Sequence, residues 1–187
     1  MGRYTHGFLM IFLGVIVVRD CQAQTASGSV TEPASRLRPA STFVAGVIEE
    51  GICRSATLRS MVATLQTTDL IVYVTMAPLS DRRVGGGLQY VGVTATDRVL
   101  RIVLRFSLDR TARMAMLGHE LQHAIEVASA PEIRSQKTLE DYYRAHGVPG
   151  ATESTYETDA AHRMEFRVRE EVTARFTKCG DVQHARN

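Results

Sequence analysis

The sequence lacks the charge pattern of a nucleic-acid-binding domain. Its 22 Lys and Arg residues are balanced by 20 Asp and Glu, which leaves a net charge of +2 at pH 7, and they form no basic run. Domains that bind nucleic acid typically carry a basic patch or stripe. Arginines such as Arg98, Arg101 and Arg105 are instead spaced as expected for the solvent faces of strands. We therefore predict no nucleic-acid partner.

Long apolar runs and paired cysteines are also missing. No apolar stretch reaches the roughly 20 residues that a spanning helix needs, so we expect no stable membrane anchor. The three cysteines include no Cys-x-x-Cys pair, which is the spacing of structural zinc sites and redox motifs. Cys53 and Cys179 could form a disulfide in an oxidising compartment, or they could pack separately as small apolar residues.

The first 40 residues predict export. Arg3 precedes an apolar block from Phe8 to Val18, and Cys21-Gln22-Ala23 follows with the small-x-small pattern of a signal-peptide cleavage site. The segment after this site is rich in Ala, Ser, Thr and Pro and has too little apolar content to fold alone. We therefore expect a periplasmic or secreted protein with a signal peptide at residues 1–23, a flexible leader at 24–40 and a folded domain at 41–187.

Hydrophobic patterning in the remaining chain predicts an α+β fold. With 44% hydrophobic and 22% charged residues, the chain can bury the core of one domain. Apolar residues recur at helical spacing in some segments, and alternate or run continuously in others. In chain order we expect a helical region Phe43–Leu65 interrupted around Gly51, a strand Leu70–Met76, a hairpin of strands Leu88–Thr94 and Val99–Phe106, a helix between Asp109 and Pro131, a helix Glu132–His146, and a last helix from Tyr156 or Thr158 to Phe176.

One motif indicates a chemistry. His119-Glu120-Leu121-Gln122-His123 lies in the middle of the helix expected between Asp109 and Pro131. Side chains four residues apart project from one face of a helix, so the two histidines can present ring nitrogens to one zinc ion. Glu120 can then take a proton from metal-bound water and return it to a leaving amine. The alternative is a surface helix with two solvated histidines.

A third metal ligand must come from elsewhere, because catalytic zinc usually takes three protein ligands. Glu157 is the first candidate, since the small residues that follow it would allow a close approach to the motif helix. Glu126 lies about 10 Å along the helix axis from His119, which disfavours it as a ligand, although it could hydrogen-bond a ligand histidine. After Glu157, the candidates in order are Glu153, Asp159, Glu126 and His162.

The two segments resemble the zincin metallopeptidases, and within them the gluzincins. The matching residues are Gly118 to His123 and the later Glu157-Thr158-Asp159-Ala160-Ala161. In gluzincins of the Glu-x-x-Ala-Asp type, the first residue of the second motif binds zinc and the last orients a ligand histidine. Here Ala161 stands in that last place, and Asp159 is displaced from it.

The resemblance implies a small zincin-like domain. In such a domain a short sheet with an edge strand packs on the active-site helix, and a downstream helix carries the glutamate. Val99 to Phe106 would be that edge strand, along which an extended peptide adds by main-chain hydrogen bonds. The implied cofactor is Zn²⁺, with His119, His123 and Glu157 as ligands and Glu120 as the catalytic residue.

From these residues we expect an exported zinc-dependent peptidase that acts on peptide or protein substrates. Two alternatives remain open. One is a zincin-like metal-binding domain with little turnover that serves as a binding or assembly module, and the other is a structural exported protein with an accidental motif. A peptidase would also need a donor that stabilises the oxyanion, and the sequence does not choose among the candidates Tyr142, Tyr143, His146, Tyr156 and His162.

Overall fold

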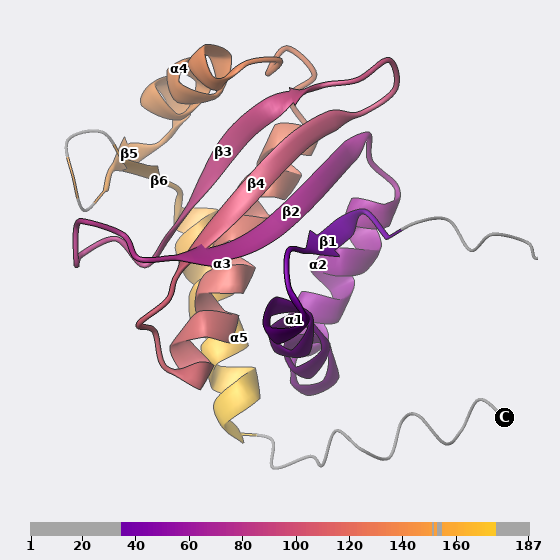
Figure 1. The fold of residues 1–187 in the computed structure, drawn as a ribbon. Helices are drawn as coiled ribbons and strands as arrows, with labels where there is room; N and C mark the ends of the chain where they lie inside the picture. The colour runs from indigo at the N-terminus through magenta and orange to yellow at the C-terminus, as the bar shows by residue number, and fades with distance from the viewer. Residues whose placement is uncertain (1–34, 151, 153–154, 175–187) are drawn as a thin grey trace, which may run out of the picture. The chain divides into compact units, whose positions relative to one another are not determined.

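A four-stranded sheet organises the fold (Figure 1). The computed structural model describes residues 35–150, 152 and 155–174. Strands β1 (Leu37–Pro39) and β4 (Arg98–Arg105) both run parallel to β2 (Leu70–Ala77), and β3 (Gly86–Val93) pairs antiparallel with β4. The strand order is therefore β1-β2-β4-β3. The mixed α+β class expected from the sequence is confirmed.

The helices gather mainly on one face of this sheet (Figure 1). Within the described residues they are α1 (Thr42–Arg54), α2 (Ala56–Gln66), α3 (Arg110–Ala128), α4 (Gln136–His146) and α5 (Asp159–Ala174). α3 packs against β2, β3 and β4, and α5 packs on α3, while α4 contacts β3. In the part of the chain that the structure describes, no helix has the length and apolar character to cross a bilayer.

The edge strand next to α3 is β3, so the expectation that Val99–Phe106 forms the edge was wrong. β4 pairs with β2 on one side and with β3 on the other, and its residues Leu100 and Ile102 are fully buried. Both strands of the hairpin are apolar in sequence. Their order in the sheet depends on the crossover from β2 to β4, which a local pattern does not reveal.

The folded unit begins before the expected start at Ser41. Residues 37–39, which we assigned to the flexible leader, form β1 and pair with Val72–Val74 of β2. A strand of three residues is too short to show alternation, and Pro39 reads as a breaker unless the strand lies at an edge. The expected signal peptide, residues 1–23, lies outside the described residues, and so does the leader up to residue 34.

The break between the first two helices falls at Ser55 rather than at Gly51. Ser55 caps α2 by accepting the main-chain N–H of Leu58 at 3.0 Å. Gly51 is buried inside α1, where a Cβ would lie 2.8 Å from Cδ1 of Leu58. The glycine therefore allows α1 and α2 to pack closely. In the sequence alone, a glycine with this tertiary role looks the same as a glycine that interrupts a helix. Cys53, near the end of α1, takes part in a disulfide bond, but its expected partner Cys179 lies outside the described residues.

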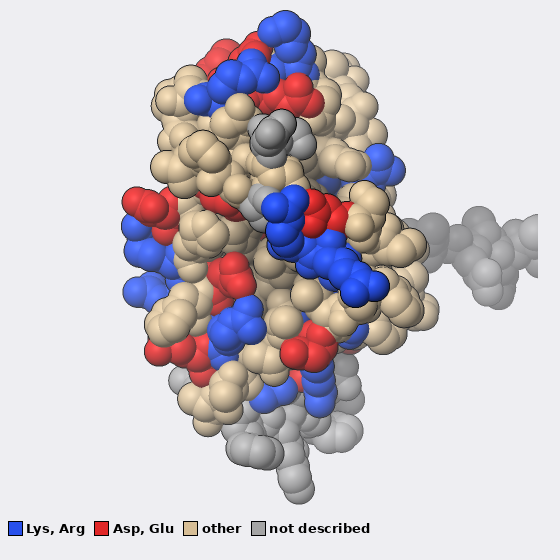
Figure 2. All heavy atoms as spheres, turned by 90° about the vertical axis from the view of Figure 1, so that its left-hand side faces the viewer, with Lys and Arg blue, Asp and Glu red and all other residues tan. Residues whose placement is uncertain are grey.

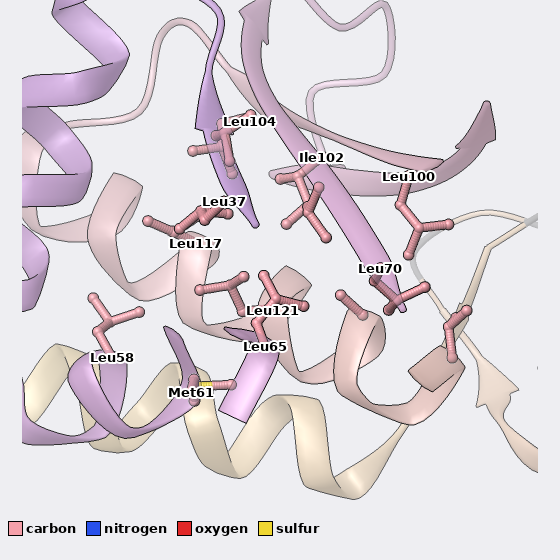
Figure 3. Packing of buried hydrophobic residues seen from close by; sticks show 14 of the residues in the cluster. Leu37, Leu58, Met61, Leu65, Leu70, Leu100, Ile102, Leu104, Leu117 and Leu121 are labelled. Atoms are coloured by element: carbon pink, nitrogen blue, oxygen red, sulfur yellow. The ribbon is translucent and has the colours of Figure 1, made fainter. Parts of the chain in front are cut away.

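Helix α3 lies at the centre of the hydrophobic core (Figure 3). Asp109 caps its first turn with its side chain, as expected. Leu117 and Leu121 are buried between sheet residues such as Ile102 and α2 residues such as Leu65. Burying a leucine stabilises the fold by about 1.5–3 kcal/mol relative to leaving it exposed. This packing fixes the position of the helix that carries the His-Glu-x-x-His motif.

A glycine sets the distance between α3 and α5. A Cβ on Gly118 would lie 2.7 Å from Cγ2 of Val168, closer than two carbon atoms can approach. Val168 and Ala161 of α5 are completely buried against this side of α3. The absence of a side chain at Gly118 therefore brings α5 close to His119, the next residue of α3.

Glu157 precedes α5 and lies in a short strand, so the expectation of a glutamate on the last helix was wrong. β6 (Tyr156–Glu157) pairs antiparallel with β5 (Val148–Pro149). The helix starts after Thr158, whose hydroxyl accepts the N–H of Ala161 at 3.1 Å. A strand of two residues is too short to show periodicity in the sequence. Only its pairing with β5 reveals that Glu157 belongs to a strand and not to the helix that follows.

Arg98 was expected on a solvent face but is only 2% exposed. It starts β4 on the same inward face as Leu100, and its guanidinium makes two 2.8 Å hydrogen bonds to the carboxylate of Asp69. It also donates to the carbonyls of Val127 and Ala130 at 3.0 and 2.8 Å. Carbonyls at the end of a helix lack partners within the helix, so Arg98 anchors the C-terminal end of α3.

Arg105 is buried as well, at the other end of β4. Its guanidinium donates to the main-chain carbonyls of Leu79 and Val84 at 3.0 and 2.7 Å. These carbonyls belong to the loop that joins β2 to β3. Arg105 therefore holds this loop against the start of the edge strand.

Candidate metal centre

Three side chains that can ligate a metal converge beside α3. His119 and His123 lie one helical turn apart, and Glu157 reaches them from β6. Nε2 of His119 is 2.6 Å from Oε2 of Glu157, Nε2 of His123 is 3.4 Å from the same oxygen, and the two Nε2 atoms are 3.2 Å apart. The histidines are 3% and 5% exposed. The structure thus brings together the three residues expected as ligands, and this buried cluster could hold a metal ion.

The separations between these atoms suit a tetrahedral ion. Ligand atoms at about 2.0–2.2 Å from a tetrahedral zinc lie about 3.3–3.6 Å from one another. The two separations that involve His123 are close to this range, and the 2.6 Å contact between His119 and Glu157 is a hydrogen bond that a metal would replace. Two imidazoles and one carboxylate are a donor set that catalytic zinc uses.

His123 is oriented by Glu126. Nδ1 of His123 lies 3.0 Å from Oε2 of Glu126, which also accepts from the hydroxyl of Tyr143 at 3.1 Å. The other carboxylate oxygen of Glu126 accepts from Thr158 at 2.8 Å. With Nδ1 donating to a carboxylate, Nε2 is left to face the metal position. Glu126 is thus not among the three converging side chains. It takes the other role considered in the sequence analysis, a hydrogen bond to one of the candidate ligand histidines.

His119 has a carboxylate neighbour that we did not predict. Nδ1 of His119 lies 3.3 Å from Oε2 of Glu165 on α5, an ion-pair contact without hydrogen-bond geometry. Glu165 follows Ala161 by four residues, so the two occupy the same face of α5 one turn apart. The acidic residue missing at Ala161 is therefore supplied one turn later. A search for an acid at i+4 from that position would have found Glu165.

Glu120 lies between the histidines and the start of β3. It is 3% exposed, and its Oε2 has no hydrogen-bond partner among the described residues. Its other oxygen lies where a Cβ on Gly86 would come within 2.8 Å. Burial raises the pKa of Glu120 to about 7, although the charges of His123 and His119 act in the opposite direction. A carboxyl with such a pKa can both take up and release a proton near neutral pH.

Burial lowers the pKa of both histidines, but the surrounding carboxylates have the larger combined effect. Glu157 and Glu165 raise the pKa of His119 to about 10, and Glu126 and Glu157 raise that of His123 to about 9. Burial raises the pKa of Glu157, and the hydrogen bonds of the two histidines lower it to about 2. The metal-free cluster therefore holds protons at neutral pH that a metal ion would displace.

The cluster lies in a cleft with two arms that share Gly86, Glu120 and Glu157 in their walls. The first arm runs toward α4, and the second runs along the β2–β3 loop and α5. Figure 2 shows the side of the molecule with this loop and the β5–β6 pair, where acidic and basic side chains are mixed. The first arm is further lined by Leu88, Gln136, Glu140, Tyr143 and Tyr156, and the second by Arg83, Val84, Met116, His162 and Glu165.

The remaining ligand candidates take no part in the buried cluster. Asp159 is exposed at the start of α5, and Glu153 lies outside the described residues. His162 is also exposed, with its ring centroid 5.3 Å from that of His119. Together with His119 and Glu165 it forms a second set whose ligand atoms lie within 4.8 Å of one another. The set with Glu157 is the more buried of the two, and it uses both motif histidines.

The candidate oxyanion donors are also separated by the structure. The hydroxyl of Tyr143 is already committed, because it donates to the carbonyl of His123 at 3.0 Å and to Glu126. Tyr142 and His146 stack on each other on α4, and neither lines the cleft. Tyr156 and His162 line the first and the second arm. These two stay as candidates.

Comparison of the chain with known family models, with curated proteins and with solved structures finds no match.

Proposed function

We propose that the protein is a zinc-dependent peptidase. The observation that carries this proposal is the convergence of His119, His123 and Glu157 beside an open cleft. The carboxyl of Glu120 lies buried next to them, and its Oε2 has no hydrogen-bond partner among the described residues. A structural site would be closed by a fourth protein ligand, whereas three ligands beside a cleft leave room for water and substrate. The zincin-like fold implied by the sequence resemblance belongs to the same proposal.

Zinc, when bound, would activate a water molecule and polarise the carbonyl of the substrate. The residues of the chain then divide the remaining work. Glu120 takes one proton from the water as the water oxygen bonds to the carbonyl carbon of the substrate. It then passes that proton to the amide nitrogen as the C–N bond breaks. Glu126 and Glu165 hold the imidazoles of His123 and His119 in position. One water is consumed, and the products are a carboxylic acid and an amine.

The substrate in this proposal is an extended peptide that adds to β3. Residues at the start of this strand line the cleft. One side of the strand has no strand partner among the described residues. Main-chain hydrogen bonds to such an edge give affinity without dependence on side chains. β3 thus takes the role that the sequence assigned to Val99–Phe106.

Metal content and hydrolysis together test the proposal. The protein should hold about one zinc per chain, and His123→Ala and Glu157→Ala should each reduce it. Glu120→Gln should keep the zinc and lower the rate of peptide hydrolysis by about 10²- to 10⁴-fold, since it removes a general base. Asp159→Asn is a matched control, because this exposed acid lies two residues after Glu157 and outside the cluster. Zinc without hydrolysis in the parent would favour a metal-binding module, and no zinc would contradict both readings.

We also propose that the protein is exported. The support is the order of charged, apolar and small residues within positions 1–23. Expression of the full chain in a bacterial host, followed by fractionation and intact mass measurement, tests it. The expected product lies outside the cytoplasm and begins after Ala23. A full-length product in the cytoplasm would contradict the proposal.

A further inference from the structure

Only alternate residues of β3 can offer their main-chain N–H and C=O groups to a peptide in the cleft. Arg105 donates its N–H to the carbonyl of Gly85 at 2.8 Å, and the register pairs Gly87 with Val103. In an antiparallel pair, alternate residues direct both main-chain groups toward the partner strand. Gly85, Gly87 and Gln89 therefore face β4. Gly86, Leu88 and Tyr90 direct their groups toward the cleft side.

A side chain of α4 already occupies the last of these three positions. The N–H of Tyr90 donates to Oε1 of Gln136 at 2.9 Å. Gln136 also lines the α4 arm of the cleft, together with Leu139 and Glu140 of the same helix. An added peptide can thus pair with Gly86 and Leu88, but at Tyr90 it meets α4. The main-chain groups available for pairing in this arm therefore end about four residues of β3 beyond the metal centre, whereas the other arm continues along the β2–β3 loop.

An exposed acidic side chain lies at this end of the arm. Glu140 lines this arm, and the amide of Gln136 donates to its Oε1 at 2.9 Å. Among the described residues no Lys, Arg or His forms an ion pair with Glu140, whereas the neighbouring Asp141 pairs with Lys137 and Arg144. The α-amino group of a peptide has a pKa of about 8, so it is largely cationic at neutral pH. A carboxylate at the end of a peptide groove suits that group and disfavours a C-terminal carboxylate.

Chain direction agrees with this charge. β3 runs from the metal centre at Gly86 toward α4 at Tyr90. A peptide antiparallel to β3 therefore has its N-terminal end at α4. Antiparallel pairing is also slightly more stable per residue than parallel pairing.

We propose that this cleft takes the free amino-terminal end of a peptide, with the ammonium group at Glu140, and that the enzyme releases short N-terminal fragments of about one to three residues. The inference rests on the proposed peptidase function, and it narrows the substrate to peptides with an unblocked amino terminus. Gln136 limits how far the bound peptide can extend along β3, and Glu140 binds the ammonium group at the amino terminus of that peptide.

Binding to the zinc-loaded Glu120→Gln protein tests the inference without turnover. The probe is one unstructured peptide in two forms, with a free and with an acetylated amino terminus, measured by calorimetry. Acetylation should weaken binding about twofold to fivefold, as expected for loss of a solvent-exposed ion pair. Adding Glu140→Gln should remove the difference between the two forms, whereas the matched control Asp141→Asn should keep it. Equal binding of both forms to the zinc-loaded protein would overturn the inference.

Gln136→Ala supplies a second test, because it frees the N–H of Tyr90. The variant should bind peptides with additional N-terminal residues better than the parent does, and mass spectrometry of parent digests should show cleavage close to the free amino terminus. Internal cleavage that ignores acetylation would overturn this inference and leave the peptidase proposal standing. A preference for the free amine in binding, with no hydrolysis by the parent, would support the recognition at Glu140 and contradict the proposed reaction.

Discussion

Two buried polar clusters contact helix α3, and they differ in how fully their atoms are paired. At the end of the helix, Arg98 donates to Asp69 and to several main-chain carbonyls, and no nitrogen of its guanidinium is left without a partner. In the middle of the helix, Oε2 of Glu120 and Nδ1 of His119 lack hydrogen-bond partners within the described residues. Arg98, His119 and Glu120 are all buried, so burial alone does not explain the difference.

The comparison separates a cluster whose polar atoms are all paired within the protein from one that could hold a metal ion. A buried polar atom without a partner costs about 1–3 kcal/mol, and more when it is charged. A cluster that serves only the fold has no reason to retain this cost, and the Arg98 cluster does not. The His119 and Glu120 cluster retains it at a position that opens into a cleft. Four experiments test this contrast, from the largest expected effect to the smallest.

Arg98→Met should lower the free energy of unfolding by about 3–5 kcal/mol, as measured by urea denaturation. The substitution removes the guanidinium that binds Asp69 and the carbonyls of Val127 and Ala130, and breaking such a buried charged network is strongly destabilising. Arg101→Met is the matched control, because Arg101 is exposed on the same strand and should change stability by less than about 0.5 kcal/mol. Similar effects of the two substitutions would show that the Arg98 cluster does not stabilise the fold.

Glu126→Gln should weaken zinc binding by about 10- to 100-fold, which is the usual range for a residue that orients a ligand histidine. The physical reason is the lost carboxylate partner of Nδ1 of His123. Competition with a fluorescent chelator measures the affinity. Glu132→Gln, at an exposed acid outside the cluster, should leave zinc affinity unchanged. Unchanged zinc affinity in Glu126→Gln would show that Glu126 does not contribute to zinc binding by orienting His123.

Glu120→Gln should stabilise the metal-free protein at high pH, unlike Arg98→Met. Burial raises the pKa of Glu120 from 4.5 to about 7 in the folded state, so the parent loses stability as the pH rises from about 4.5 through about 7. Glutamine imitates the neutral acid, so the variant should be more stable by up to about 3 kcal/mol above pH 7 and equally stable below pH 4.5. Thermal unfolding across this pH range measures the difference. A variant that is less stable at pH 8 would contradict the unpaired state of Glu120.

Zinc binding should release about one proton or more per chain at pH 7. The pKa values of His119 and His123 are raised to about 10 and about 9 without metal, and ligation requires unprotonated Nε2 atoms. Since these two nitrogens face each other at 3.2 Å, they share their protons as a pair. Calorimetry in buffers with different ionisation enthalpies counts the protons, and zinc affinity should fall as the pH falls. An enthalpy that is independent of the buffer would contradict this prediction.

The sequence predicted the local part of the site and missed the parts that depend on tertiary contacts. The spacing of His119 and His123 needs only helical geometry, and the helix formed with the expected cap at Asp109. Glu157 was predicted from the small residues that follow it, but its place in a two-residue strand depends on pairing with β5. Glu165 was missed because its relation to His119 exists only across the contact between α3 and α5.

The errors in the fold have the same origin. Gly51 was read as a break because glycine is a poor helix former, and the structure uses it for contact between α1 and α2. Arg98 was placed on a solvent face because charged residues are rarely buried without a partner, and here Asp69 and the end of α3 supply the partners. The edge of the sheet was assigned to β4 on the basis of the family resemblance. The assignment was wrong because strand order depends on crossovers, and β4 lies between β2 and β3.

The missing side chain at Gly118 also bears on which ion the centre would choose. α3 carries two of the candidate ligands, and the third lies just before α5, so the gap between these helices would set the width of a metal site. Zinc needs bonds of about 2.0–2.2 Å, whereas calcium takes oxygen ligands at about 2.3–2.6 Å. A methyl group at position 118 would widen the gap and shift the preference toward larger ions. In the proposed zinc site, selectivity would therefore depend on a residue that offers no ligand atom.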